Sequence, residues 1–344
     1  MSATSTAQAG ERRLTLRAPG RLHLGFLDPA ASLGRRFGSL GLVVEGFETV
    51  VEISASTADR ISAASPAAQA QVERANAFLH ALRERSGQHQ PLHLRLLQVL
   101  PAHAGFGSGT QLALAVGRAF AQWHGLDVPT ATLASWLSRG LRSGVGIAGF
   151  DQGGLLLDAG PSTDGKPAPL LARIALPEAW RIVVVCDPEH RGLSGEQERQ
   201  AIASLPSLSR ADSADICHQV LMRVLPGAAC AEFEPFAVGI SHIQRLLGAH
   251  FAPAQGGSAY TSPRVGTLVR WMCDASRKEQ GAAIGQSSWG PTGFVIVPTQ
   301  AQAEALVERA RAAAAVDPAL ALCIVGARNH GAVLDERFVR GAGN

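Results

Sequence analysis

The stretch Leu100-Pro-Ala-His-Ala-Gly-Phe-Gly-Ser-Gly-Thr-Gln-Leu-Ala-Leu-Ala-Val-Gly-Arg-Ala-Phe120 decides the fold. Leucines alternate along residues 92–100, which predicts a strand with one buried face. Apolar residues recur at helical spacing over 112–120. The order of elements is therefore strand, glycine-rich turn and helix. The glycines allow the turn to adopt positive φ, and the N-terminus of the helix presents unpaired N–H groups that can bind an anion. We expect a phosphate or diphosphate to bind at Gly105, Gly107, Ser108, Gly109, Thr110 and Gln111.

A glycine-rich turn that only caps a packed helix is the alternative to an anion site, because glycine spacing alone is a weak signal. Two better-known phosphate loops are excluded. A P-loop needs a Lys before its Ser or Thr, and this turn contains no Lys. The dinucleotide pattern G-x-G-x-x-G, started at Gly105, needs glycine at position 110, where Thr110 stands.

Length and composition predict a globular chain of two domains. Its 344 residues exceed what one compact core usually holds, and 46% are hydrophobic against 17% charged. The net charge of +3 is too small to favour nucleic acid or an anionic membrane surface as a partner. No segment is apolar enough to span a membrane, and the five cysteines are dispersed. We therefore expect free thiols and a cytoplasmic location.

Predicted strands and helices interleave, which indicates an α/β or α+β class. We expect a disordered leader over 1–11, an N-terminal domain over 12–170 and a C-terminal domain over 171–340, with the boundary near the Pro- and Gly-rich segment 160–169. Strands are expected at 14–18, 22–28, 40–44, 49–53, 92–100, 155–157, 180–186, 294–297 and 322–325, with a turn at 19–20 and a loop over 56–70. Helices are expected at 68–85, 112–120, 130–141 with Thr130 as N-cap, 212–224, 234–249, 263–278 and 301–315.

An alternating strand follows the turn at 19–20 and places Arg21 and His23 on the face opposite its apolar side chains. For a lone Arg or His in such a strand, a solvated face is the usual explanation. Here the pair follows the segment Ala18-Pro-Gly-Arg21, which resembles a known signature, and we therefore assign both residues a function.

Three segments in order resemble the signatures of the GHMP superfamily of small-molecule kinases. The first is Ala18-Pro-Gly-Arg21, and the third is Gly290-Pro-Thr-Gly293 before a strand. The second is the loop from Pro101 to Ser108, which follows Pro-x-x-x-Gly-Leu-Gly-Ser-Ser-Ala except that Gly109 replaces the second Ser. The resemblance implies an α+β fold of two domains, an N-terminal domain with a left-handed βαβ unit and a C-terminal ferredoxin-like domain, with the active site between them.

Kinase chemistry does not follow from this resemblance. Typical GHMP kinases with a catalytic base carry Ser-Gly-x-Asp some residues before Gly-Gly. Here Ser143-Gly-Val-Gly146 precedes Gly153-Gly154, so Gly146 stands where an Asp would accept the proton of a hydroxyl nucleophile. The chain keeps a binding site for linked phosphoryl groups but lacks the catalytic groups that phosphoryl transfer requires.

Four motifs give a closer match. They are Phe106-Gly-Ser-Gly-Thr-Gln-Leu-Ala-Leu-Ala115, Gly140-Leu-Arg-Ser-Gly-Val-Gly146 with Phe150-Asp-Gln-Gly-Gly154, Arg191-Gly-Leu-Ser-Gly-Glu196 and Gly285-Gln-Ser-Ser-Trp-Gly-Pro-Thr292. They resemble the β-ribofuranosylaminobenzene 5'-phosphate synthase family over nearly the whole chain. That resemblance implies a pentosyltransferase that condenses phosphoribosyl diphosphate with 4-aminobenzoate or 4-hydroxybenzoate into a C-glycoside. It releases CO2 and diphosphate, as a step of methanopterin biosynthesis in one-carbon metabolism.

The resemblance also implies the ligands. They are two small-molecule substrates with Mg2+, without ATP, NAD or pyridoxal phosphate, and without a nucleic-acid or membrane partner; a homodimer is a family expectation. Such substrates need cations for a carboxylate and a 5'-phosphate, for which Arg is better suited than Lys. The candidate catalytic residues are Arg21, His23, Arg142 and Asp151; the candidate substrate contacts are Ser143, Arg191, Gln286, Ser287, Ser288, Trp289 and Thr292; and the candidate metal ligands are Asp28 and Glu196.

Several of these residues have plainer explanations. Arg142 suits the C-terminal dipole of a preceding helix. Trp289 is equally consistent with packing between domains, and Asp151 with the capping of a turn. The sequence does not choose between the amino and hydroxyl acceptors, nor between the arginines for the carboxylate and the 5'-phosphate.

Two other functions stay open from the sequence alone. One is an ATP-dependent GHMP kinase that acts on a small alcohol, against which Gly146 argues. The other is a non-catalytic regulator that binds a phosphorylated metabolite.

Overall fold

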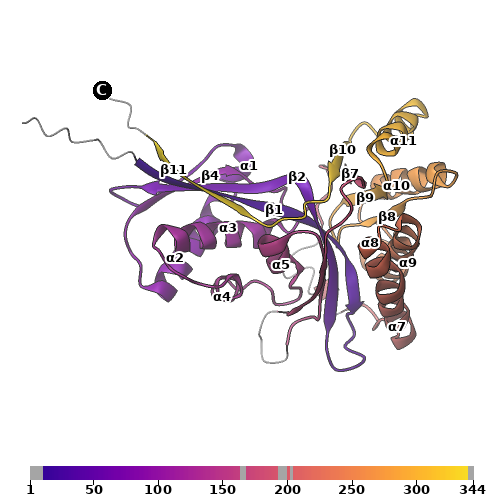
Figure 1. The fold of residues 1–344 in the computed structure, drawn as a ribbon, viewed down its shortest axis with the longest axis horizontal. Coiled ribbons are helices and arrows are strands. Elements are labelled where there is room, and N and C mark those ends of the chain that lie inside the picture. Colours follow the sequence, from indigo (N-terminus) through magenta and orange to yellow (C-terminus); the bar gives the residue numbers. More distant parts are fainter. Residues whose placement is uncertain (1–10, 163–167, 193–199, 202–203, 340–344) are drawn as a thin grey trace, which may run out of the picture.

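The computed structural model describes residues 11–162, 168–192, 200–201 and 204–339, and they form two bodies joined by a long hairpin (Figure 1). The described strands of the first body form a seven-stranded sheet, in which β11-β1-β2-β4-β3 are neighbours and β5 and β6 extend from β2. These strands are β1 (Glu11–Asp28), β2 (Phe37–Ala55), β3 (Arg60–Ala63), β4 (Leu92–Gln98), β5 (Leu155–Asp158), β6 (Leu170–Ile174) and β11 (Val333–Val339).

Apart from the short α1, the helices of the first body lie on one side of this sheet (Figure 1). They bury an apolar layer that includes Leu79, Leu114 and Phe120, against Leu94 and Leu96 of β4. Strands β3 and β4 are parallel and are connected through α1 and α2, which is the expected βαβ unit. The helices are α1 (Pro66–Gln69), α2 (Val72–Ser86), α3 (Ser108–Trp123), α4 (Thr130–Trp136) and α5 (Val145–Gln152).

The second body has the ferredoxin-like arrangement. Its described strands form an antiparallel sheet of order β10-β7-β9-β8, and the chain passes through strand, helices, two strands, helix and strand. The strands are β7 (Arg181–Cys186), β8 (Ala283–Gln286), β9 (Thr292–Val297) and β10 (Ala321–Gly326). The helices are α7 (Arg210–Gln219), a π-helical turn (Val220–Val224), α8 (Leu225–Ala229), α9 (Phe233–Phe251), a 3-10 turn (Ala252–Gln255), α10 (Pro263–Ser276) and α11 (Gln300–Ala312).

One apolar core connects the two bodies. Leu22, Leu24 and Leu42 of the β1–β2 hairpin belong to the same buried cluster as Phe236 and Ile240 of α9. The far end of the hairpin runs beside α7 and α9 (Figure 1). Because apolar burial holds the hairpin to both bodies, residues on β1 keep a fixed position at their junction.

The N-terminal strands differ from the sequence prediction. Strand β1 continues through Pro19, where a turn was expected, because the register with β2 shifts between Pro19 and Arg21 and so tolerates a residue without an N–H. The two strands predicted at 40–44 and 49–53 are parts of the single strand β2. The segment 56–70, expected as a loop, contains β3 and α1.

The helix predicted at 130–141 ends at Trp136, because the left-handed conformations of Ser138 and Gly140 are incompatible with a continued helix. Pro129, not Thr130, is its N-cap residue. The predicted division at residue 170 also does not coincide with the division between the sheets. Strand β6 begins at that residue and β11 follows it, and they pair in the first sheet with β5 and β1 respectively. The strand expected to be the last, β10, is thus followed by a further strand, β11.

All five cysteines are free thiols, as the sequence predicts. None of the helices in the described part of the chain combines the length and the apolarity that a membrane crossing requires.

Candidate functional site

The glycine-rich turn leads directly into α3. Gly107 is the N-cap residue of this helix and takes φ 76°, a left-handed conformation that favours glycine. The N–H groups of Thr110 and Gln111 donate to the Gly107 carbonyl oxygen at 3.0 and 3.1 Å. The N–H groups of Ser108 and Gly109 are therefore the leading donors of the first turn, where the helix dipole favours an anion.

The loop between β8 and β9 lies directly on this turn. Ser287 Oγ donates to the Gly105 carbonyl oxygen at 2.8 Å and accepts from the His23 N–H at 2.9 Å. Ser288 N–H donates to the His23 carbonyl oxygen at 3.1 Å. A Cβ on Gly105 would lie only 2.5 Å from the Ser287 carbonyl oxygen. Two loops far apart in the sequence and strand β1 are thus fixed against one another.

The turn opens onto a cavity of about 250 Å³ with a positive lining, which we call the arginine cavity. Arg21 reaches it from β1, Arg74 from α2, and Arg139 and Arg142 from the segment between α4 and α5. No Asp or Glu is among its lining residues in the described chain. Four guanidinium groups beside a helix N-terminus favour a ligand with several phosphoryl groups. The other lining residues are His103, Gly105, Gly107, Ser108, Gly109, Thr110, Ser288, Trp289 and Gly290.

Arg21 is held against the turn. Its Nη1 donates to the Gly105 carbonyl oxygen at 2.6 Å, and its Cζ lies 3.2 Å from where a Cβ on Gly107 would stand. Glycine at position 107 therefore serves both the backbone conformation and the approach of this guanidinium.

Arg74 and Arg139 were missed by the sequence analysis. Both guanidinium groups lie over the Phe78 ring, with Cζ 5.9 and 5.3 Å from its centroid. Burial lowers the pKa of each guanidinium below its ordinary value, and the charge of Arg74 lowers the pKa of Arg139 further. Arg139 directly precedes the motif that begins at Gly140, and this position could have indicated a place in the site. Arg74 offers no such indication, because only the packing of α2 against α3 brings it to the turn.

The position where kinases carry an Asp faces the turn without a carboxylate. A Cβ on Gly146 would lie 3.2 Å from Thr110 Cγ2, so this position is adjacent to the predicted anion site. Gln111 Nε2 donates to the Gly146 carbonyl oxygen at 2.9 Å. Gln111 is therefore buried between α3 and α5 and does not line the arginine cavity, unlike the other five residues predicted to bind diphosphate.

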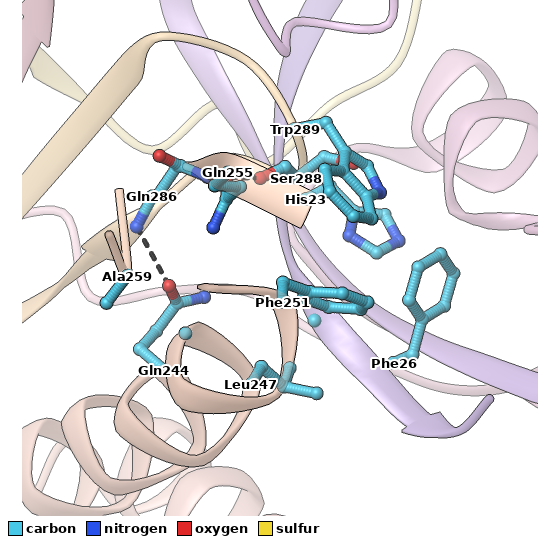
Figure 2. A pocket seen from close by; sticks show the side chains of 12 residues that line it. His23, Phe26, Gln244, Leu247, Phe251, Gln255, Ala259, Gln286, Ser288 and Trp289 are labelled. Carbon is cyan, nitrogen blue, oxygen red and sulfur yellow. Dashed lines mark hydrogen bonds between the residues drawn. The ribbon is translucent and has the colours of Figure 1, made fainter. Parts of the chain in front are cut away.

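A second, smaller cavity next to the arginine cavity is lined by His23 and other aromatic side chains. Figure 2 shows the rings of His23, Phe26, Phe251 and Trp289 gathered at one end of this small cavity of about 30 Å³. The ring centroids of His23 and Phe26 are 4.6 Å apart, and those of Phe251 and Trp289 are 4.7 Å apart. Ser288 and Trp289 line both this cavity and the arginine cavity, so aromatic surface lies beside the arginines.

A larger cavity of about 580 Å³ opens on the other side of Arg142, and we call it the outer cavity. Phe37, Leu208 and Phe251 supply apolar walls, and Arg36 and Arg142 supply positive charge. Arg142 thus lines both the outer cavity and the arginine cavity. The predicted contact Ser143 lines a neighbouring hollow of about 360 Å³ that also includes Arg21 and Arg142.

Three predicted residues have structural partners near the site. Ser287 is bonded to the turn as described above. Gln286 lines the small cavity, where its Nε2 donates to Gln255 Oε1 at 2.9 Å. Thr292 is fully buried between β9 and β7, and its Oγ1 donates to Cys186 Sγ at 3.7 Å.

Three other predicted residues do not line the arginine cavity, and a fourth lies outside the described residues. Asp151 Oδ1 accepts from Thr130 Oγ1 at 2.6 Å, which ties α5 to α4. Asp28 Oδ2 accepts from the Ser32 N–H at 2.7 Å and so stabilises its own turn. Arg191 is exposed and lines none of these cavities, and Glu196 lies outside the described residues. The described residues contain no cluster of three metal-ligating side chains.

Asp158 was also missed, although it fixes the segment that carries Arg142. It is fully buried, and burial raises its pKa despite the hydrogen bonds that it accepts. The N–H groups of Gly144 and Val145 donate to Oδ2 at 2.7 and 3.1 Å, which anchors the start of α5. The usable signal is an Asp that ends an otherwise apolar strand. Its remaining donors are Ser39 N–H, Gly160 N–H and Ser143 Oγ.

The buried imidazole of His23 predicts a pH dependence of stability. Burial, followed by the charges of Arg21 and Arg142, lowers its pKa well below 6.5. The unfolded chain binds a proton that the folded chain does not, so the stabilisation is complete above the unfolded pKa and is lost as pH falls. We expect His23→Gln to remove about 1.4 kcal/mol of acid-induced destabilisation per pH unit below the unfolded pKa.

Urea unfolding between about pH 7.5 and 5.5 measures this difference. The exposed His89→Gln variant should keep the wild-type pH dependence. If His23→Gln kept it too, His23 would not be the group responsible.

The class of protein is set by both halves of the chain. The family model for the GHMP kinases N terminal domain matches residues 73–157, and that for the GHMP kinases C terminal matches residues 240–316. Among solved structures, the phosphomevalonate kinase of Streptococcus pneumoniae superposes with a TM-score of 0.67 at 15% identity, over 91% of this chain and 99% of that one. The chain therefore has the GHMP kinase fold, and the turn predicted to bind an anion lies at the start of α3.

Curated relatives narrow this class to one family. The β-ribofuranosylphenol 5'-phosphate synthase of Archaeoglobus fulgidus is 32% identical over 301 residues, which cover 84% of this chain and 89% of the relative. The synthase of the same name from Methanothermobacter thermautotrophicus is 29% identical and covers 82% of this chain and 88% of its own length. The chain belongs to the β-ribofuranosylphenol 5'-phosphate synthase family, a family of pentosyltransferase-type enzymes.

Proposed function

We propose that this protein joins ribose C1 of phosphoribosyl diphosphate to an aromatic acid and releases CO2 and diphosphate. One observation carries the proposal: four arginines meet at the N-terminus of α3, while Gly146 stands where a kinase would hold its base. The site is thus suited to holding a polyphosphorylated sugar and lacks the group that activates a hydroxyl nucleophile.

The arginine cavity would bind the leaving group. As the bond between ribose C1 and the diphosphate oxygen breaks, negative charge grows on the diphosphate. The N–H groups of Ser108 and Gly109 and the guanidinium of Arg21 are fixed before the reaction, and so stabilise that charge without reorganisation. The electron-deficient C1 is then open to attack by carbon.

The acceptor would enter through the outer cavity. The attacking atom is the ring carbon that bears the carboxylate, and the para substituent supplies electron density to it. Once the carbon–carbon bond to C1 has formed, the bond to the carboxylate breaks, CO2 leaves, and the electron pair restores the aromatic ring. Arg142 lines both cavities, so it is placed to bind the carboxylate at their junction.

The relatives are named for a ribofuranosylphenol product, so we propose 4-hydroxybenzoate over 4-aminobenzoate as the acceptor. Methanopterin biosynthesis, a cytoplasmic location and a homodimer stay predictions. The described lining of the arginine cavity offers no carboxylate to Mg2+, and Asp28 is engaged in its own turn. The described residues therefore do not fit a protein-held Mg2+, and no step above depends on it.

An incubation with phosphoribosyl diphosphate and carboxyl-labelled aromatic acid tests the proposal. We expect the release of labelled CO2 and of an equal amount of unlabelled diphosphate. The rate of release should be higher with 4-hydroxybenzoate than with 4-aminobenzoate. ADP formed from ATP and a small alcohol, at ordinary enzyme rates, would favour a kinase instead. Binding of phosphoribosyl diphosphate without turnover of either acid would favour a regulator.

A further inference from the structure

Arg74 occupies the space that a side chain at position 109 would need. A Cβ on Gly109 would lie 2.5 Å from Arg74 Nη2 and 3.1 Å from Arg74 Cζ, and the first distance is shorter than real Cβ contacts. Gly109 is the second residue of α3 and is not among the residues with positive φ. The backbone conformation therefore does not require glycine here, but a side chain at this position would have to displace the guanidinium of Arg74.

Within the described part of the chain, Arg74 has no ion-pair partner, and Arg139 has none either. The two cations lie over one Phe78 ring and beside each other, and both line the arginine cavity. Half-buried like charges repel, so this arrangement gains stability when an anion binds between them and the α3 N-terminus.

We propose that Arg74 determines ligand specificity by binding, together with Arg139, a phosphoryl group at the N-terminus of α3, and that Gly109 is the residue that admits it. In the signature that this loop resembles, a Ser stands at this position. Exchange of a hydroxyl for a guanidinium replaces a neutral donor with a fixed charge that accepts a phosphoryl group in bidentate geometry. The ligand class is a diphosphate ester, and only the identity of that ester depends on the proposed function.

Inorganic diphosphate is the probe, and calorimetric titration of the full chain is the measurement. We expect Arg74→Ala to weaken diphosphate binding about 10- to 100-fold, because two charge-assisted hydrogen bonds are lost. Arg74→Lys should recover part of this loss, since it restores charge but not the fork. Arg85→Ala is the matched control, because Arg85 is an exposed arginine of the same helix.

A double-mutant cycle separates this role from a structural one. Gly109→Ala should weaken diphosphate binding in the wild-type background, because the methyl group displaces the guanidinium. In the Arg74→Ala background the same substitution should have no further effect, because nothing remains to displace. Thermal unfolding shows whether each variant is folded. In the Arg74→Ala background, Gly109→Ala should not lower the melting temperature, because alanine has a higher helix propensity than glycine and its methyl group meets no guanidinium there.

Unchanged diphosphate affinity in Arg74→Ala, or equal effects of Gly109→Ala in both backgrounds, would overturn the inference. Diphosphate binding requires no turnover, so the two proposals fail separately. If the cycle behaves as expected while no CO2 is released, the anion site stands and the synthase function falls. If CO2 is released while Arg74→Ala binds diphosphate normally, the function stands and this inference falls.

Discussion

An Arg21→Ala enzyme is expected to lose about 10²- to 10³-fold in kcat/KM for phosphoribosyl diphosphate, the typical cost of removing one fixed donor from a developing negative charge. Arg21 donates to the Gly105 carbonyl oxygen at 2.6 Å and lies against Gly107, so its guanidinium is placed beside the leaving group before the reaction begins. Ser287 still donates to Gly105 in the variant, so the turn itself should stay in place.

Steady-state kinetics with both substrates measure this effect. The control is Arg17→Ala, which removes a more exposed arginine from the same strand, where it pairs with Glu48. We expect Arg17→Ala to stay within about twofold of wild type, because a surface ion pair contributes little. Comparable activity losses in the two variants would point to net charge, rather than to the position of Arg21, as the cause.

Replacement of Gly105 by alanine is expected to destabilise the whole site. Gly105 has φ 92°, and its Cβ would lie 2.5 Å from the Ser287 carbonyl oxygen. The left-handed conformation and the overlap together cost about 2–5 kcal/mol. Because the turn and the β8–β9 loop must separate to relieve this overlap, activity should fall by more than the loss of stability alone would produce.

Gly87→Ala is the control for the backbone contribution. Gly87 ends α2 with φ 70° and has nothing within 4 Å of its Cβ position, so only the cost of the left-handed conformation, about 1–2 kcal/mol, applies. Denaturant unfolding and kcat/KM should be measured for both variants. Equal destabilisation and retained activity in Gly105→Ala would show that the two loops are not held together as described.

The local patterns of the sequence predicted the parts of the site that are continuous in the chain. Glycine spacing between a strand and a helix located the turn at Gly105, Gly107 and Gly109, because the positive φ of Gly105 and Gly107 is a local property of the chain. The resemblance of Ala18-Pro-Gly-Arg21 to a known signature assigned Arg21 to the site. The motif over 285–292 made Ser288 and Trp289 candidate substrate contacts, and both line the arginine cavity.

Other parts depend on tertiary packing that no local pattern encodes. Arg74 lies on an ordinary amphipathic helix, and it reaches Gly109 only because α2 packs on α3. Gln111 and Thr292 belong to the right motifs but point into buried contacts, which spacing along the chain does not reveal. The return of β11 to the first sheet is likewise a long-range pairing with β1.

The central claim is that a kinase-type anion turn holds a leaving diphosphate while a carbon–carbon bond forms at ribose C1. The most direct measurement labels ribose C1 of phosphoribosyl diphosphate and the carboxylate-bearing ring carbon of 4-hydroxybenzoate with ¹³C, and records the product by NMR. The account predicts a one-bond coupling between the two labelled carbons, together with loss of the carboxylate. A product whose ribose C1 is bonded to oxygen and whose ring keeps its carboxylate would contradict it.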